Sequence, residues 1–356
     1  MQEIIYTSSP DTTLADIITG LQPDKVFFLA DRHTAHHCLP RLVAEPMECH
    51  AFPAGEESKN PETLFDVLRW LSSLGCTRHS LLVNVGGGVV TDLGGFAAGI
   101  FKRGIRFVNV PTSLLAMVDA SVGGKTGIDF NGCKNEVGVF ACATHVIIAP
   151  TFLQTLDMEN FLSGYAEMLK HSLLIGREAW ERHIAFLEDF RTGGQITAGG
   201  KAADDALMSL IKESIAFKQH IVDEDPKERG IRKCLNLGHT LGHAIESLLL
   251  EKGRPVLHGY AVAWGLVCEL YLSCVLCQFP TDRMRQTVQC IKERYGQFLF
   301  TCKEYDRLYA LMQHDKKNEG NTINFSLLAD IGDIRLNQTA TKEQIFEALD
   351  FLREGN

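Results

Sequence analysis

The stretch Ser80-Leu81-Leu82-Val83-Asn84-Val85-Gly86-Gly87-Gly88-Val89-Val90-Thr91-Asp92-Leu93-Gly94-Gly95 joins an apolar run to three glycines and a second apolar segment. The run 80–85 predicts a strand, and residues 89–101 predict a helix. Glycines at such a junction let backbone N–H groups approach a phosphate, and the start of the helix adds partial positive charge. The spacing differs from the G-x-G-x-x-G fingerprint. The turn alone supports a phosphate-binding loop and a tight turn without a ligand about equally.

Similar apolar runs flank this unit on both sides. Residues 25–30, 106–110 and 145–149 predict further strands, and residues 61–74 carry apolar side chains at helical spacing. Continuous apolar strands joined by helices are typical of a mostly parallel sheet covered on both faces. The sequence therefore predicts an α/β domain over residues 1–152.

The pattern changes after about residue 151. Helical periodicity dominates, and one β-like run over 322–328 interrupts it before a last helix that Thr341 caps. The other helices are expected at 158–175, 203–222, 237–250, 259–276 and 283–295. We expect a second, mainly α-helical domain over residues 153–356.

The bulk composition is that of a globular protein with two domains. Of the residues, 45% are hydrophobic and 22% are charged, as in soluble globular proteins. A length of 356 residues exceeds that of a domain with one hydrophobic core. A formal net charge of -9 argues against a nucleic-acid or anionic-membrane partner. No signal peptide or transmembrane-length run is evident, and eleven scattered cysteines favour a reduced cytoplasm over a disulfide framework.

A histidine motif in the second half suggests a metal site. His239 and His243 are four residues apart, Asn236 and Glu246 bracket them, and His258 follows. Residues at this spacing share one face of a helix. Imidazoles with a nearby carboxylate suit a divalent transition metal such as zinc, although paired histidines also occur on solvated helix faces.

Two other patterns have both a structural and a functional interpretation. Glu167 and Lys170 are three residues apart, which fits a surface ion pair or a carboxylate metal ligand. The block 111–127 carries small polar residues, Gly123, Gly124 and Lys125, but it lacks the spacing of a P-loop.

Several long motifs occur in a fixed order. They are Pro53-Ala54-Gly55-Glu56-Glu57-Ser58-Lys59, the glycine turn, Lys102-Arg103-Gly104, the block 111–127, Lys134-Asn135, residues 164–174, the histidine motif, Leu257-His258-Gly259 and Asp315-Lys316-Lys317. Together they closely resemble the 3-dehydroquinate synthases, the sugar-phosphate cyclases of the shikimate pathway. The resemblance covers about residues 53–328.

The resemblance implies NAD, a divalent metal (zinc or cobalt) and the substrate 3-deoxy-D-arabino-heptulosonate 7-phosphate. It implies three metal ligands, Glu167, His239 and His258, and leaves His243 on the substrate side. Residues at the family's NAD positions are Glu56, Lys59, Gly87, Gly88, Asp92, Thr112, Ser113, Asp119, Lys125, Lys134 and Thr155. Residues at its substrate and catalytic positions are Asp119, Lys125, Asn135, Lys170, Lys218, Arg232, Asn236, His243, Arg103 and Lys316. A homodimer is also implied, with Arg103 reaching across its interface.

By the same resemblance the reaction is a phosphate-eliminating cyclisation in which NAD is reduced and reoxidised within one cycle. The alternatives are another sugar-phosphate cyclase, a metal-dependent polyol dehydrogenase that releases NADH, and a catalytically inactive nucleotide-binding regulator. The chain departs from the family at Thr91, at Ser113, in the loop 130–133 and in an apparent insertion over 251–255.

Overall fold

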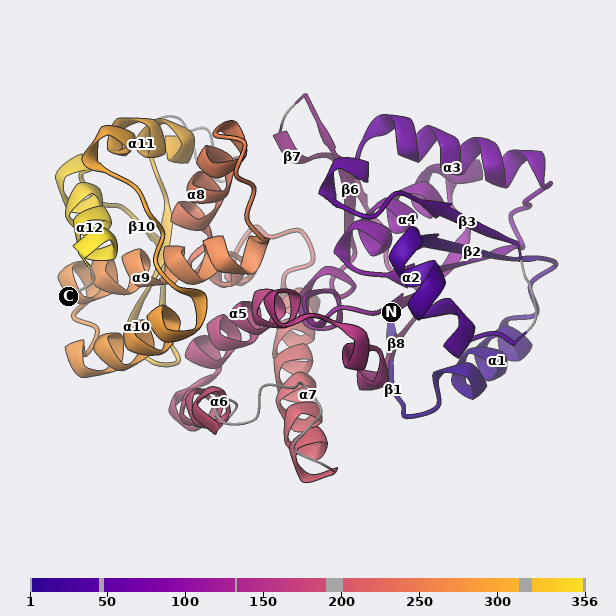
Figure 1. Cartoon of the computed structure of the whole chain (residues 1–356), viewed down its shortest axis with the longest axis horizontal. Coiled ribbons are helices and arrows are strands. Elements are labelled where there is room, and N and C mark those ends of the chain that lie inside the picture. Colours follow the sequence, from indigo (N-terminus) through magenta and orange to yellow (C-terminus); the bar gives the residue numbers. More distant parts are fainter. Residues whose placement is uncertain (1, 45–47, 132, 190–200, 314–321, 355–356) are drawn as a thin grey trace. The chain divides into compact units, whose positions relative to one another are not determined.

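The computed structural model describes residues 2–44, 48–131, 133–189, 201–313 and 322–354, with side chains from residue 205 onward in the fourth range. By its internal contacts the chain divides into two compact units, residues 1–157 and 158–356. The elements of both units can be followed in Figure 1. The predicted change from an α/β half to a helical half is therefore seen directly in the structure.

The first unit is built on a six-stranded parallel sheet in the order β1-β8-β5-β4-β2-β3. The strands are β1 (Glu3–Tyr6), β2 (Val26–Asp31), β3 (Cys49–Phe52), β4 (Leu81–Gly86), β5 (Arg106–Pro111) and β8 (His145–Ile148). The helices are α1 (Pro10–Leu21), α2 (Arg32–His37), α3 (Pro61–Ser73) and α4 (Gly88–Ile100), with short helical turns at Leu39–Arg41, Glu56–Ser58, Phe101–Arg103 and Pro150–Thr155.

The predicted junction of strand and helix at residues 80–101 is confirmed as β4 followed by α4. Every residue of β4 is buried, as expected for an interior parallel strand. Gly94 lets α4 lie close to this strand, because a Cβ atom there would meet Asn84 Oδ1 at 2.1 Å. The glycine turn at residues 86–88 therefore lies between a buried strand and a helix that packs closely on that strand.

The block 111–127 forms structure that the sequence did not predict. It contains a π-helical turn at Ala116–Ala120 and enters an antiparallel hairpin of β6 (Lys125–Phe130) and β7 (Cys133–Phe140). The hairpin packs against α4. Residues that read as a loop therefore form an ordered extension beside the glycine turn.

The second unit is mainly helical, as predicted. Its elements are α5 (Met158–Ile175), α6 (Arg177–Asp189), α7 (Lys201–Glu224), a helical turn at Ile231–Asn236, α8 (His239–Glu251), α9 (His258–Cys277), α10 (Thr281–Tyr295), a turn at Cys302–Glu304, α11 (Tyr305–Gln313), β9 (Phe325–Asp330), β10 (Asp333–Gln338) and α12 (Lys342–Glu354). The β-like run at 322–328 corresponds to β9, which pairs with β10.

Helix α9 is the centre of this unit and packs against α5, α8, α10, α12 and β9. It is long and apolar enough to cross a membrane, but 67% of its most apolar window is buried within the protein. That burial is the property of a core helix. Gly265 lets α8 and α9 approach each other, because a Cβ atom there would meet Gly238 O at 2.0 Å.

All eleven cysteines are free thiols. Cys274 and Cys277 form a C-x-x-C pair at the end of α9, a spacing that is often found in redox or metal sites. Burial raises the pKa of both thiols, that of Cys274 to about 11, so little reactive thiolate is present at neutral pH.

Candidate active site

The carboxyl ends of β4 and β5 present an open helix start. Gly87 occupies the N-cap position of α4 and makes no side-chain capping hydrogen bond to the N–H groups of the first turn. Thr112 N donates to Gly86 O at 3.0 Å, and a Cβ atom on Gly87 would lie 3.4 Å from Ser113 Oγ. These groups therefore lie together at the edge where parallel α/β sheets bind ligands, and uncapped N–H groups suit a phosphate.

A buried lysine links the segment before α3 to α4 and the hairpin. Lys59 Nζ lies 2.6 Å from Asp92 Oδ2 and 2.6 Å from Asn135 Oδ1. Burial alone would lower the pKa of Lys59, but the charges of Asp92 and Glu56 outweigh it and raise the pKa above its usual value. The lysine is therefore charged, and it brings three of the predicted residues together.

The hairpin residues Lys134 and Asn135 are held beside Lys59 by a chain of contacts. Asn135 N donates to Asp129 Oδ1 at 2.8 Å, and Asp129 N donates to Lys59 O at 2.8 Å. Lys134 Nζ lies 3.5 Å from Glu56 Oε1. Asp129, which the sequence analysis did not identify, thus positions Asn135 against Lys59.

The remaining predicted residues of the first unit lie on other segments. Asp119 is in the π-helical turn, Lys125 begins β6 and is exposed, and Thr155 ends the turn 150–155. Arg103 follows α4 with an exposed side chain and a left-handed backbone, φ 68°. Of these four, Asp119 acts on the Lys59 cluster, because its charge helps to raise the pKa of Asp92.

In the second unit, one carboxylate and two imidazoles converge from three helices. Glu167 is on α5, His239 begins α8 and His258 begins α9. His239 Nε2 lies 3.3 Å and His258 Nε2 lies 3.7 Å from the same atom, Glu167 Oε1. Glu167 is fully buried, and Oε1 has no hydrogen-bond partner among the described residues, while Oε2 pairs with Lys170 Nζ. A buried carboxylate oxygen that faces two ring nitrogens is a donor set suited to a divalent metal.

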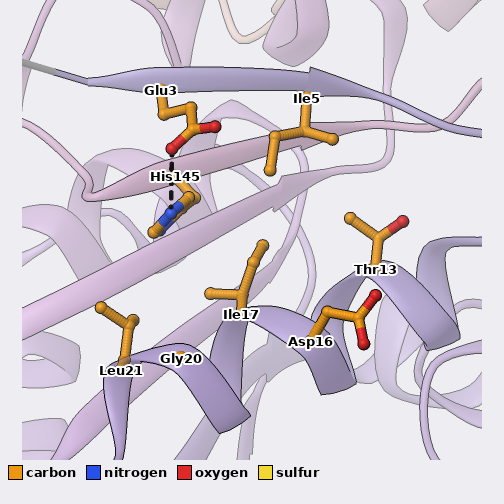
Figure 2. A pocket seen from close by; sticks show the side chains of 8 residues that line it. All are labelled: Glu3, Ile5, Thr13, Asp16, Ile17, Gly20, Leu21 and His145. Carbon is orange, nitrogen blue, oxygen red and sulfur yellow. Dashed lines mark ion pairs between the residues drawn. The ribbon is translucent and has the colours of Figure 1, made fainter.

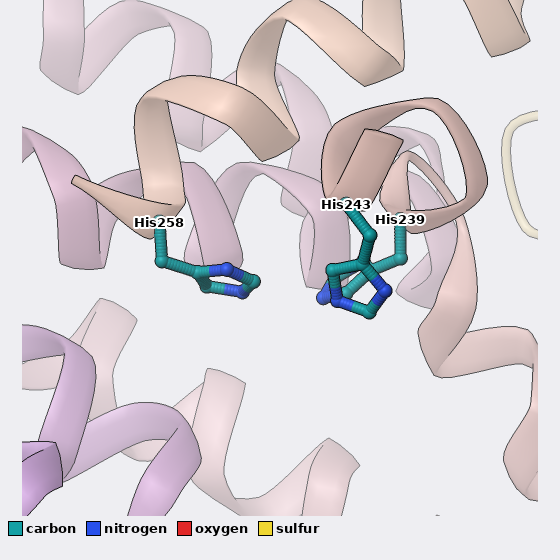
Figure 3. Close-up of side chains that lie close together, drawn as sticks. All are labelled: His239, His243 and His258. Atoms are coloured by element: carbon teal, nitrogen blue, oxygen red, sulfur yellow. The ribbon is translucent and has the colours of Figure 1, made fainter. Parts of the chain in front are cut away.

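His243 belongs to the same cluster. Figure 3 shows the rings of His239, His243 and His258 close to one another. The ring centroid of His239 lies 5.3 Å from that of His243 and 5.4 Å from that of His258, and the last two are 5.8 Å apart. One nitrogen of each ring lies within 4.8 Å of the others. The geometry therefore offers a second donor set, with His243 in place of Glu167, and the position of the rings alone does not choose between the two.

Hydrogen bonds at Nδ1 orient the two rings nearest Glu167. His258 Nδ1 lies 3.1 Å from Glu246 Oε2, and His239 Nδ1 lies 3.1 Å from Leu237 O. A carbonyl or carboxylate oxygen accepts, so each Nδ1 carries the proton and each Nε2 keeps its lone pair. Glu246 lies near the histidines in the sequence, but its spacing from them does not predict this role.

Charges around the cluster favour a neutral His239 and an ionised Glu167. Burial and the charge of Lys170 lower the pKa of His239 to about 3. Burial alone would raise the pKa of Glu167, but neighbouring positive charge, that of Lys170 first, outweighs it and holds that pKa well below its usual value. Both groups are thus in the protonation state that a metal requires.

Three further predicted cations are buried in this unit. Lys170 is 1%, Arg232 2% and Lys218 6% exposed. Arg232 Nη1 donates to Pro226 O at 2.8 Å, and Asn236 Nδ2 donates to Glu228 Oε1 at 2.8 Å. Lys316, the last predicted residue, lies outside the described residues.

The sequence of the chain matches one family over most of its length. Residues 49–163 match the model of the 3-dehydroquinate synthase N-terminal domain, and residues 164–318 match that of the C-terminal domain. A 3-dehydroquinate synthase of Parabacteroides distasonis is 49% identical over 99% of this chain and 98% of its own length.

This chain belongs to the 3-dehydroquinate synthase family.

Solved structures of sugar-phosphate cyclases share the fold of this family member. A 2-epi-5-epi-valiolone synthase of Streptomyces hygroscopicus, solved with NAD+ and Zn2+, is 24% identical with a TM-score of 0.86 over 100% of this chain and 98% of that one. A 2-deoxy-scyllo-inosose synthase, solved with carbaglucose-6-phosphate, NAD+ and Co2+, is 23% identical with a TM-score of 0.81 over 99% and 96%. At these identities the likeness establishes the architecture alone.

A separate hollow of about 570 Å³ lies in the first unit of this family member, beside α1, β1 and β8 (Figure 2). Its lining includes Ile5, Ile17 and an ion pair between His145 Nε2 and Glu3 Oε2 at 3.3 Å. None of the predicted site residues lines it, so the hollow and the predicted sites are different places.

Proposed function

We propose that this protein converts 3-deoxy-D-arabino-heptulosonate 7-phosphate into 3-dehydroquinate and phosphate, as a carbon-oxygen lyase that uses NAD and a divalent metal in every turnover. Membership of the family supports the reaction. The observation that carries the proposal for this chain is the buried Glu167 Oε1, which faces the Nε2 atoms of His239 and His258. We assign these three residues as the ligands of zinc or cobalt.

The first unit fits a dinucleotide. The start of α4, which has no side-chain cap, offers backbone N–H groups to a pyrophosphate. The charged Lys59 binds Asp92, a residue of the same helix. We place NAD binding in the predicted domain 1–152 and metal and substrate binding in the predicted domain 153–356. NAD supplies reversible hydride transfer when bound, and the metal supplies polarisation of a substrate oxygen.

Three of the chain's own cations support binding of an anionic substrate. Lys170, Lys218 and Arg232 are all buried in the second unit. They place positive charge inside a protein whose formal net charge is -9. Burying cations costs free energy, so such a group supports recognition of negative charge. We assign these cations, with Asn236, to the phosphate and carboxylate of the substrate.

His243 is assigned a proton-transfer role. His243 lies one turn after His239 on α8, and the centroids of the two rings are 5.3 Å apart. A histidine can accept and return a proton near neutral pH, which the deprotonation of a substrate hydroxyl requires. We further propose a cytoplasmic homodimer in which Arg103 contributes to the partner's substrate site.

We expect Lys59→Met to weaken NAD binding by about 10-fold or more and to destabilise the first unit by up to about 3 kcal/mol, because Asp92, whose side chain is only 17% exposed, would lose its cation. Calorimetric titration with NAD and thermal unfolding measure the two effects. Lys25→Met is a matched control, because Lys25 Nζ donates to a backbone carbonyl at the surface, Leu74 O, at 2.8 Å. Unchanged NAD affinity in Lys59→Met would contradict the assignment.

Substrate choice tests the proposed function. The purified protein with NAD and zinc should release phosphate from the heptulosonate 7-phosphate and not from glucose 6-phosphate, which has no carboxylate for the buried cations. Phosphate assays on both compounds at equal concentration make the comparison. Faster release from glucose 6-phosphate would instead indicate another sugar-phosphate cyclase.

A further inference from the structure

A buried carboxylate on α9 holds the start of α8. Glu269 is 0% exposed, and its side chain accepts three backbone hydrogen bonds from the residues around His239. Gly238 N donates to Oε2 at 2.6 Å, and Thr240 N and Leu241 N donate to Oε1 at 3.0 and 3.3 Å. A carboxylate placed on uncapped N–H groups stabilises a helix start and fixes its direction.

The local sequence explains why another helix supplies this carboxylate. Gly238 is the N-cap of α8 and has a left-handed backbone, φ 80°. A Cβ atom there would meet Leu266 Cγ at 2.7 Å, so the N-cap position cannot carry a side chain of its own. Glu269 therefore takes the place of the usual capping residue.

The same carboxylate is connected to His239 through one peptide group. The N–H of the Leu237–Gly238 peptide donates to Glu269, and the carbonyl of that peptide, Leu237 O, lies 3.1 Å from His239 Nδ1. An ionised acceptor on the N–H side polarises the peptide and makes its carbonyl a stronger acceptor. The arrangement favours the tautomer with the proton on Nδ1, which leaves the lone pair of Nε2 directed at Glu167.

We propose that Glu269 is a positioning residue of the metal centre, acting on His239 through the Leu237–Gly238 peptide. The inference rests on the proposed function, because it takes His239 as a metal ligand. His258 receives its carboxylate directly, from Glu246 at 3.1 Å, whereas His239 receives one through a peptide. The Nδ1 atom of each imidazole is thus linked to a carboxylate, directly for His258 and through a peptide for His239. Such links strengthen metal binding.

The test is Glu269→Gln in the full-length protein. Glutamine keeps the size of the side chain but turns an NH2 group toward one of the backbone N–H donors. We expect Zn2+ affinity, measured by chelator competition, to fall by about 10- to 100-fold. The visible absorption spectrum of the Co2+-loaded protein should also shift, because ligand geometry at the ion changes.

Glu304→Gln is the matched control. Glu304 Oε2 accepts from Thr301 N at 2.8 Å and caps the turn 302–304, so the variant loses a capping carboxylate in the same unit without touching a histidine. Its melting temperature should fall while Zn2+ affinity and the Co2+ spectrum stay as in the unaltered protein. Equal metal affinity and spectra in Glu269→Gln and the unaltered protein would overturn the inference.

Two measurements separate the inference from the proposed function. Failure of the unaltered protein to bind Zn2+ or Co2+ would contradict the proposed function itself. Nitrogen NMR of the unaltered, metal-free protein reads the tautomer of His239 without any variant, so the inference stays testable where Glu269→Gln does not fold. Protonation at Nδ1 is expected, and protonation at Nε2 would overturn the inference.

Discussion

Replacing Glu167 with alanine should remove the metal and the activity together. The residue is fully buried and places Oε1 3.3 and 3.7 Å from the two imidazole Nε2 atoms. Polarisation by a bound metal contributes several kcal/mol to a transition state, so its loss should lower kcat/KM by about 1000-fold or more. Elemental analysis and steady-state assays measure the two effects.

The alanine variant also leaves Lys170 buried without its carboxylate, which lowers stability. Glu167→Gln keeps the size of the side chain and an oxygen acceptor, so it controls for cavity formation. It should fold and still bind the metal much more weakly than the unaltered protein. Full metal occupancy in folded Glu167→Gln, with activity retained, would show that Glu167 is not a ligand.

The second large effect distinguishes His239 from His243. We expect His239→Ala to lose the metal and the activity. His243→Ala should keep nearly all its metal and its NAD affinity but lose about 100- to 10,000-fold in kcat, the range of general acid–base catalysis. Metal content, NAD titration and kcat are measured on both variants.

Each variant is a control for the other, because the two residues lie on one helix, one turn apart. The close grouping of three ring nitrogens makes the alternative concrete, since His239, His243 and His258 could together bind an ion. Equal metal loss in both variants would place His243 among the ligands and would remove its proposed role in proton transfer.

Much of the fold could be predicted because its elements carry strong local signals. The junction of β4 and α4 combines an uninterrupted apolar run with consecutive glycines, and the helices of the second unit have clear periodicity. The hairpin of β6 and β7 lacks such a signal. Six of the eight residues of β7 are exposed. The strand therefore has no buried face, and its sequence does not need the alternation of apolar and polar residues by which a strand is predicted. Its order comes from pairing and from packing on α4.

The candidate site divides in the same way. The residues alone indicated His239, His243 and His258 as candidate ligands and left Glu167 open between an ion pair and a metal ligand. Only the resemblance selected Glu167, His239 and His258 and excluded His243. The supporting residues could not be found from spacing. Glu246 meets a histidine 12 residues later, and Glu269 meets a backbone N–H 31 residues earlier. Such contacts depend on how α8 packs on α9, which local periodicity does not specify.

We expect this protein to use NAD as a catalyst and to regenerate it in each turnover. The most direct test follows absorbance of NADH and formation of 3-dehydroquinate together, with the heptulosonate 7-phosphate in large excess over NAD. We predict many equivalents of 3-dehydroquinate and phosphate per NAD, with no net accumulation of NADH. Steady growth of NADH in proportion to product would contradict the catalytic use of NAD and identify a dehydrogenase.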